Sequence, residues 1–493
     1  MMKKSSVGWY LLGAIFILGI FLRVYNIPNT LLFHFDQGYH GLAIKEIWEN
    51  KRIALLGHKT DVEGVFHGSV FYYLALPFYL VSSWNPAGVS FLFALLDAFS
   101  IIFIFLIGKK LFGEKVGFLA GLLYATSYSV VSYSRWLSNV TLIPFFSSIF
   151  FYLLVKGLKE NLFFFVFACF FAGLMIQLNG AIGFFFLPLL IFLVFWKRKK
   201  FFAQKKYLAG SIVFFLLPSL PLIFFEARHN LLVSRSIFRL FFQEGNLGFN
   251  VAKVIKNLTL LETEIINLFS YKIPLISLAL VILTVLAVIM IFARKEKVKD
   301  QVELICLFVL VPFLGLVFYQ GGIHAFFIMG LLPVLVIFFS WGLIFWGEKG
   351  FLRLPIFVLV LAIIFLNLYH WQGFLKPGFN LIPIGTRNLI TLKDRKEAAD
   401  FMYQESGGMP FKTLIYIIPY FQEQPWDYVF SWYGKSNYGY LPNPEATKTF
   451  VIYEPDYDFP YRLTNWLGKI GEDHGGMVSS FKTHDLIVEE REK

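Results

Sequence analysis

Cysteine and charge are both scarce in this chain of 493 residues. The two cysteines, Cys169 and Cys306, lie inside apolar segments, so neither a disulfide framework nor a cysteine metal site is indicated. Charged residues make up 15% of the chain, whereas hydrophobic residues make up 57% and aromatic residues 19%. A soluble globular protein has about a quarter charged and about half apolar residues. The composition therefore predicts an integral membrane protein.

The net charge of +12 does not indicate a nucleic-acid-binding protein. The basic residues form short clusters between apolar segments, which is the pattern of cytoplasmic loops, and they do not form one continuous basic surface. We therefore expect membrane lipids as partners and no nucleic acid.

Apolar segments long enough to cross a bilayer recur along most of the chain, and hydropathy predicts about eleven transmembrane helices. They are expected near residues 7–25, 89–107, 116–133, 141–155, 162–176, 181–196, 207–225, 273–292, 302–318, 324–345 and 354–369. One more apolar segment, 69–83, is short and contains Pro77, so we predict an interfacial or re-entrant helix there.

The basic clusters predict the orientation of the chain. If residues 69–83 do not cross the membrane, the later clusters fall on the same side as Lys3 and Lys4. This predicts a multi-pass protein, in the plasma membrane, with a cytoplasmic N-terminus and an extracytoplasmic C-terminus.

The character of the sequence changes after residue 371. We predict a transmembrane domain over residues 1–371 and a small extracytoplasmic α/β domain over residues 372–493. In the second domain, residues 394–406 have helical spacing and end at Gly407-Gly408, a plausible helix stop. Strands are expected at 413–418, 429–433 and 450–453.

Polar residues gather in the loops predicted to be extracytoplasmic. Asp36 follows the first span directly and precedes a polar loop. Carboxylates beside cations on one face suit a proton transfer next to a lipid phosphate ester. The residues expected to bind substrate are Gln37, His40, Lys59, His67, Tyr72, Tyr73, Arg135, Asn139, Gln177, Asn179, Glu226, Arg228 and His229.

The acid after the first span, the segment Phe66 to Tyr73 and the pair Ser134-Arg135 resemble the GT-C membrane glycosyltransferases. The similarity is to their protein O-mannosyltransferase and aminoarabinose transferase branch. This resemblance implies a GT-C-like helical fold, a polyprenyl-phosphate sugar donor and Asp36 as the catalytic base. Where relatives often have an acid in the second external loop this chain has Asn139, which leaves dependence on a divalent cation open.

The mechanism we expect is inverting transfer of a sugar to a hydroxyl group of a protein, lipid or glycan. Asp36 would accept the hydroxyl proton, and Arg135 with Arg228 and His229 would hold the leaving phosphate. Hydrogen bonds from Gln177 and Asn179, and stacking on Tyr72 and Tyr73, would complete the site.

Each of these residues also has a structural interpretation. Asp36 could be the N-cap of an interfacial helix, and Arg135 a membrane-interface anchor. Arg228 and His229 could bind lipid headgroups, and the two tyrosines could belong to an aromatic belt. His40, His67 and Glu226 fit no compact metal motif, so no cofactor is predicted with certainty.

Two other functions are compatible with a polytopic chain. A transporter or flippase of lipids or sugar-lipids usually carries charges in mid-membrane, whereas here the spans have almost no central acid except Asp97. A non-catalytic scaffold would not explain polar residues in successive external loops.

Overall fold

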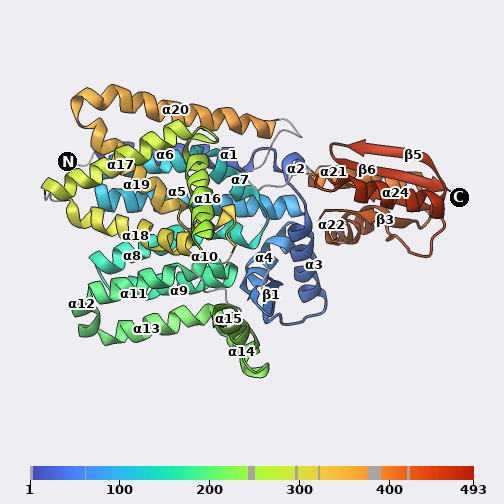
Figure 1. Cartoon of the computed structure of the whole chain (residues 1–493), viewed down its shortest axis with the longest axis horizontal. Helices are drawn as coiled ribbons and strands as arrows, with labels where there is room; N and C mark the ends of the chain where they lie inside the picture. Colours follow the sequence, from blue (N-terminus) through green and yellow to red (C-terminus); the bar gives the residue numbers. More distant parts are fainter. Residues whose placement is uncertain are drawn as a thin grey trace.

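The chain forms a bundle of long helices with a smaller sheet-containing region at one end (Figure 1). The computed structural model describes residues 4–60, 63–242, 250–294, 298–319, 322–375, 390–418 and 422–492. Within these ranges, seven helical stretches are long and apolar enough to cross a membrane. Their main helices are α1 (Lys4–Val24), α5 (Pro86–Phe112), α8 (Ile143–Lys159), α13 (Lys205–Leu216) with α14 (Leu220–Arg228), α17 (Pro274–Arg294), α18 (Lys299–Phe318) and α20 (Arg353–Trp371).

The remaining predicted spans are bent or shorter helices. The helices α6 (Glu114–Thr126) and α7 (Tyr128–Arg135) meet at 59° and would together form an eighth span. Shorter apolar helices are α4 (Val70–Val81), α9 (Phe163–Leu178), α10 (Gly180–Phe184) with α11 (Phe186–Trp196), and α19 (Leu332–Gly347). All eleven predicted segments are thus helical, and the chain is a multi-pass integral membrane protein. The number of helices that cross the bilayer stays a prediction.

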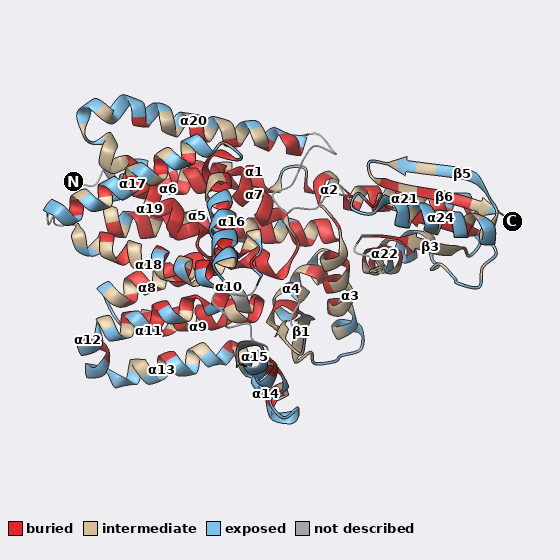
Figure 2. Ribbon diagram, viewed as in Figure 1, coloured by how far each residue is buried: buried red, intermediate tan, exposed pale blue. Residues whose placement is uncertain are grey.

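Buried side chains concentrate in the central helices, whereas α13 and α20 at the periphery expose much of their surface (Figure 2). The exposed residues of these two helices include Ile212, Val213, Phe357 and Phe365, as expected for helices that contact lipid. Asp97, the acid inside a predicted span, is 1% exposed and forms an ion pair with Arg23 at 2.8 Å.

The buried ion pair joins three helices. Tyr124 of α6 donates its hydroxyl to the other oxygen of Asp97 at 2.7 Å, while Arg23 of α1 also donates to the carbonyl oxygens of Tyr124 and Ala125. Because both charges are desolvated and fully hydrogen-bonded, this cluster fixes α1, α5 and α6 against one another.

The two ends of the bundle differ. The N-terminus lies at one end, and the C-terminal region projects from the opposite end (Figure 1). Lys115 at the start of α6 pairs with Glu348 after α19 at 2.7 Å. The C-terminal end carries the loop between α1 and α5, made of α2 (Ile27–Thr30), α3 (Phe35–Glu49), β1 (Leu56–Lys59), β2 (Phe66–Gly68) and α4.

Further helices connect the bundle. They are α12 (Arg198–Ala203), α15 (Leu232–Phe242) and α16 (Val251–Ser270), the last of which crosses the long helices at a steep angle (Figure 1). Short 3-10 turns lie at η1 (Asn139–Leu142), η2 (Leu217–Ser219), η3 (Ala325–Gly330), η4 (Gly350–Leu352) and η5 (Gln372–Leu375).

The C-terminal region, residues 390–492, is a small α/β unit, as predicted. Its sheet has the order β3-β4-β6-β5, in which only the β3–β4 pair is parallel. The strands are β3 (Lys412–Tyr416), β4 (Thr449–Tyr453), β5 (Gly476–Thr483) and β6 (Leu486–Glu492). The helices are α21 (Leu392–Glu405), α22 (Gln424–Val429), the π-helical turn η6 (Phe430–Gly434), α23 (Lys435–Tyr438) and α24 (Pro460–His474).

The strand predicted at 429–433 is wrong, because this segment is helical in α22 and η6. Pro425 occupies the first turn of α22, where a missing N–H costs nothing. Trp426 and Phe430, one helical turn apart, stack with ring centroids 5.5 Å apart and are both buried. The domain boundary at residue 372 and the side of the membrane stay predictions.

Candidate active site

Asp36 lies half-buried in the first turn of α3, on the loop between α1 and α4. It is not the N-cap of this helix. His34 holds that position, and its backbone N–H donates to the side-chain oxygen of Gln37 at 2.8 Å. The structure therefore does not support the interpretation of Asp36 as an N-cap. A carboxylate in the first turn also interacts favourably with the helix dipole.

Gln37 connects the loop that follows α1 to the segment that follows α7. Its side-chain nitrogen donates to the carbonyl oxygen of Leu137 at 3.2 Å, and the side chain is 2% exposed. Leu137 follows Arg135 by two residues, so one hydrogen bond links the segment that carries Asp36 to the segment that carries Arg135.

The guanidinium group of Arg135 is buried at the end of α7, where Nη2 donates to the hydroxyl of Thr30. The group stacks 4.1 Å from the ring centre of Phe374, and Nη1 has no hydrogen-bond partner among the described residues. Arg135 also lines a small cavity of about 30 Å³, which is room for roughly one water-sized group. The residues around this cavity are Thr30, Leu31, Leu32, Ser132, Arg135, Trp136 and Phe374. A planar cation whose Nη1 has no partner among the described residues is suited to a phosphate oxygen.

His40 and Tyr72 form an aromatic cluster beside α3. The ring of His40 lies edge-on to Phe71 at 4.9 Å and to Tyr72 at 5.9 Å. Burial, together with the neighbouring His58 and His67, lowers the pKa of His40 to about 3, so its ring is neutral at physiological pH. Tyr73 is more exposed and donates its hydroxyl to a backbone carbonyl at 2.9 Å.

The polar residues of the second and third loops bond mainly to the protein itself. Asn139 donates to the carbonyl oxygen of Leu178, and Asn179 caps α10 through the backbone N–H of Ile182 at 3.2 Å. Gln177 donates to Ser219 at 2.8 Å. These bonds draw the loops together.

The side-chain oxygen of Gln177 faces the backbone of Gly68 on β2, where a β-carbon would overlap it. The same oxygen has no hydrogen-bond partner among the described residues. Gln177 therefore packs the third loop against the first, and its side-chain oxygen is buried at that contact.

The fourth loop packs against the first loop, at β1 and Gly64. Glu226 accepts from the backbone N–H groups of Val233 and Ser234 at 2.8 and 2.9 Å, and so caps α15. Arg228 and His229 are exposed and stack on phenylalanines of their own helix. Among the residues the structure describes, neither makes a polar contact with Arg135.

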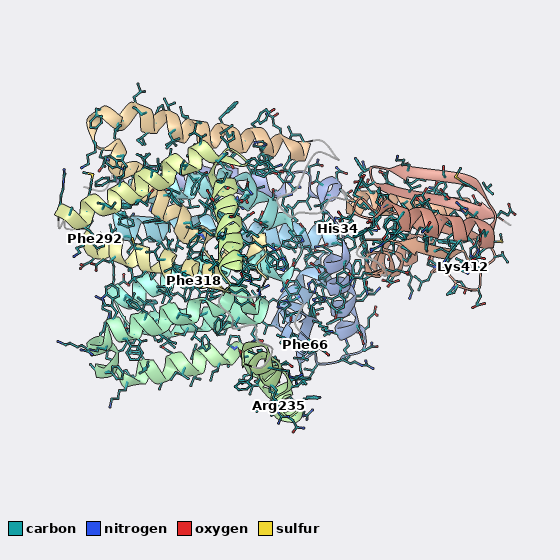
Figure 3. All side chains as sticks on the ribbon, in the orientation of Figure 1. His34, Phe66, Arg235, Phe292, Phe318 and Lys412 are labelled. Atoms are coloured by element: carbon teal, nitrogen blue, oxygen red, sulfur yellow. The ribbon has the colours of Figure 1, made fainter. Side chains whose placement is uncertain are left out.

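Figure 3 places α15, marked by Arg235, at the edge of the bundle, whereas His34 lies at the junction with the C-terminal region. Lys59 is exposed at the end of β1, and His67 is half-buried on β2. In the described ranges, no group of three or more His, Cys, Asp or Glu side chains is placed to hold a metal ion.

Sequence reasoning missed two partners of Arg135 and two further buried arginines, Arg23 and Arg395. Thr30 and Phe374 come from distant parts of the chain and carry no motif. Arg395 of α21 is fully buried, donates from Nε to the carbonyl oxygen of Phe33 at 2.8 Å and pairs with Glu454 at 2.9 Å. Arg395 lies in a helix of mixed charge, and nothing in the sequence around it predicts that it is buried and bonded to Phe33.

Residues 67–224 match the model of the family described as dolichyl-phosphate-mannose-protein mannosyltransferase. No curated protein matches the sequence. Among solved structures, ArnT from Cupriavidus metallidurans bound to undecaprenyl phosphate superposes with a TM-score of 0.60 at 11% identity. The match covers 99% of this chain and 98% of ArnT. The fold is that of the GT-C glycosyltransferases.

A second GT-C structure agrees. The archaeal oligosaccharyltransferase AglB from Archaeoglobus fulgidus, in complex with an inhibitory peptide and a dolichol-phosphate, gives a TM-score of 0.57 at 12% identity. That match covers 99% of this chain and 74% of AglB. The predicted fold class is confirmed by both similarities.

Proposed function

We propose that this GT-C chain is a glycosyltransferase that moves a sugar from a polyprenyl-phosphate donor to a hydroxyl acceptor. The observation that carries the proposal is the bond that joins the segment of Asp36 to the segment of the buried Arg135. The Gln37 to Leu137 hydrogen bond holds the two segments together at the end of the bundle that carries the C-terminal region. A base and a phosphate-binding cation are the two groups that such a transfer needs.

Arg135 is the group we assign to the donor phosphate. Its Nη1 would donate a charge-assisted hydrogen bond to a phosphate oxygen, while Nη2 stays on Thr30 and the ring of Phe374 holds the guanidinium plane. ArnT was solved with undecaprenyl phosphate, and AglB with a dolichol-phosphate, which supports a donor of this chemical class.

Asp36 is the group we assign to proton transfer. The acceptor hydroxyl gives its proton to the carboxylate, and its oxygen forms a bond to the anomeric carbon of the sugar. The bond from that carbon to the phosphate oxygen breaks, and the polyprenyl phosphate leaves with the electron pair, held by Arg135. Attack from the side opposite the leaving group inverts the anomeric configuration.

The remaining predicted residues take supporting roles in this proposal. His40 and Tyr72 form the wall beside α3, Asn139 joins the second loop to the third, and Gln177 joins the third loop to Ser219. We place the reaction on the extracytoplasmic face of the plasma membrane, because the basic helix α12 lies at the opposite end of the bundle (Figure 1).

Transfer by the purified full-length protein in lipid nanodiscs tests the proposal. The donor would be undecaprenyl phosphate carrying a radiolabelled sugar, offered with a panel of protein, lipid and glycan acceptors. We expect the amount of labelled product to equal the amount of undecaprenyl phosphate released. The same assay in the presence of EDTA tests whether transfer depends on a divalent cation. Translocation of labelled lipid across vesicles without consumption of donor would instead show a flippase.

A further inference from the structure

The C-terminal region is bonded directly to the loop that carries Asp36. The backbone N–H of Leu392 donates to the carbonyl oxygen of Leu31 at 2.8 Å, and that of Phe33 donates to Ile390 at 3.2 Å. Leu32 and Thr391 form an antiparallel bridge between these bonds. The segment just before α3 is therefore paired with the segment just before α21.

Arg395 adds a buried side-chain bond to this ladder. Its Nε holds the carbonyl oxygen of Phe33, three residues before Asp36, and its Nη2 pairs with Glu454, which follows β4. Both charged side chains are almost completely inaccessible to solvent. The position of the Phe33 carbonyl is thus set by the sheet of the C-terminal region.

The helix α22 packs against the face of α3 where two glycines allow close approach. A β-carbon on Gly38 would lie 2.5 Å from the backbone nitrogen of Pro425, and one on Gly41 would overlap the ring of Tyr428. The Tyr428 hydroxyl donates to the carbonyl oxygen of Trp84 at 2.6 Å, between α4 and α5. Tyr428 therefore holds α3 between the C-terminal region and the bundle.

We propose that the C-terminal region positions the helix that carries Asp36, with Arg395 and Tyr428 as positioning residues. The inference rests on the proposed role of Asp36 in transfer. Neither residue touches the reacting atoms. They act by fixing the start of α3 and one of its faces, and displacement of a reacting group by about 1 Å can cost on the order of 100-fold in rate.

Three variants of the full-length protein test this inference. Gly41→Ala forces α3 away from Tyr428, Tyr428→Phe removes one hydroxyl across the junction, and Arg395→Lys cannot hold Phe33 and Glu454 together. Matched controls lie inside the C-terminal region. Gly468→Ala adds a methyl group in α24 where no atom lies within 4 Å, and Tyr416→Phe removes a hydroxyl bonded to Asp456 at 2.8 Å.

Two measurements are made on every variant, namely backbone hydrogen exchange in residues 35–49 and steady-state transfer. We expect faster exchange in α3 and a fall in kcat for the three junction variants, on the order of 10-fold for Gly41→Ala, with the donor KM within about twofold. The two controls should match the wild type in both measurements.

Wild-type exchange in α3 for a folded Tyr428→Phe and a folded Arg395→Lys would overturn the inference. Faster exchange with an unchanged kcat would overturn it as well. A wild-type protein that transfers no sugar would count against the proposed function alone, because the exchange comparison between junction and control variants still reports whether the C-terminal region holds α3.

Discussion

Replacement of Arg135 gives a sharp test of the proposed phosphate site. In Arg135→Gln the buried positive charge and the planar fork are both lost, whereas Arg135→Lys keeps the charge but cannot serve Thr30 and a phosphate oxygen in one plane. One hydrogen bond that involves a charged group contributes about 1.5–3 kcal/mol. Loss of the bond from Nη1 should therefore weaken donor binding by roughly 10-fold to 150-fold.

The assay is a titration of purified protein with undecaprenyl phosphate, followed by native mass spectrometry. We expect Arg135→Gln to bind most weakly and Arg135→Lys to lie between Gln and the wild type. Arg228→Gln is the matched control, because Arg228 is exposed and should leave the dissociation constant within about twofold. The reasoning is refuted if a folded Arg135→Gln binds like the wild type, or if Arg228→Gln weakens binding equally.

Three further predictions concern stability, measured by thermal unfolding in detergent. The pKa of His40 is about 3 because of burial and two neighbouring histidines, so stability should fall by up to about 1.4 kcal/mol per pH unit below pH 6.5, and His40→Gln should reduce that fall. Burial raises the pKa of Glu264 to about 7, so stability is lost as the pH rises from 4.5 through 7. Glu264→Gln, which can still accept from Tyr133, should therefore be more stable than the wild type at pH 8 by up to about 3 kcal/mol and similar at pH 4.5. Asp97→Asn leaves the Arg23 charge buried without its partner and should cost about 3–5 kcal/mol, and a loss below 1 kcal/mol would contradict the structural role of this pair.

The membrane fold follows from the sequence because each span must be apolar along its whole length. Every predicted span is helical in the structure, and Pro77 does lie in a short helix, α4. Polar residues at successive helix ends also predict that the loops at one end of the bundle converge. The bonds of Gln37 to Leu137 and of Asn139 to Leu178 show how those loops meet.

The rest depends on contacts between distant parts of the chain. Phe374 reaches Arg135 from a position 239 residues later, and Arg395 reaches Phe33 across 362 residues. No local sequence pattern predicts contacts between residues so far apart in the chain. The error at 429–433 has a different cause. Aromatic residues favour strands by propensity, which is why a strand is predicted. In the structure, Trp426 and Phe430 pack on one face of a helix, and this packing outweighs the propensity.

The central claim is that Asp36 accepts the proton of the acceptor hydroxyl. The most direct measurement is single-turnover transfer from a labelled undecaprenyl-phosphate sugar by Asp36→Asn, a change that keeps the size of the side chain and removes its basicity. The account predicts a rate at least about 100-fold below the wild type with donor binding unchanged. A rate near that of the wild type would contradict it.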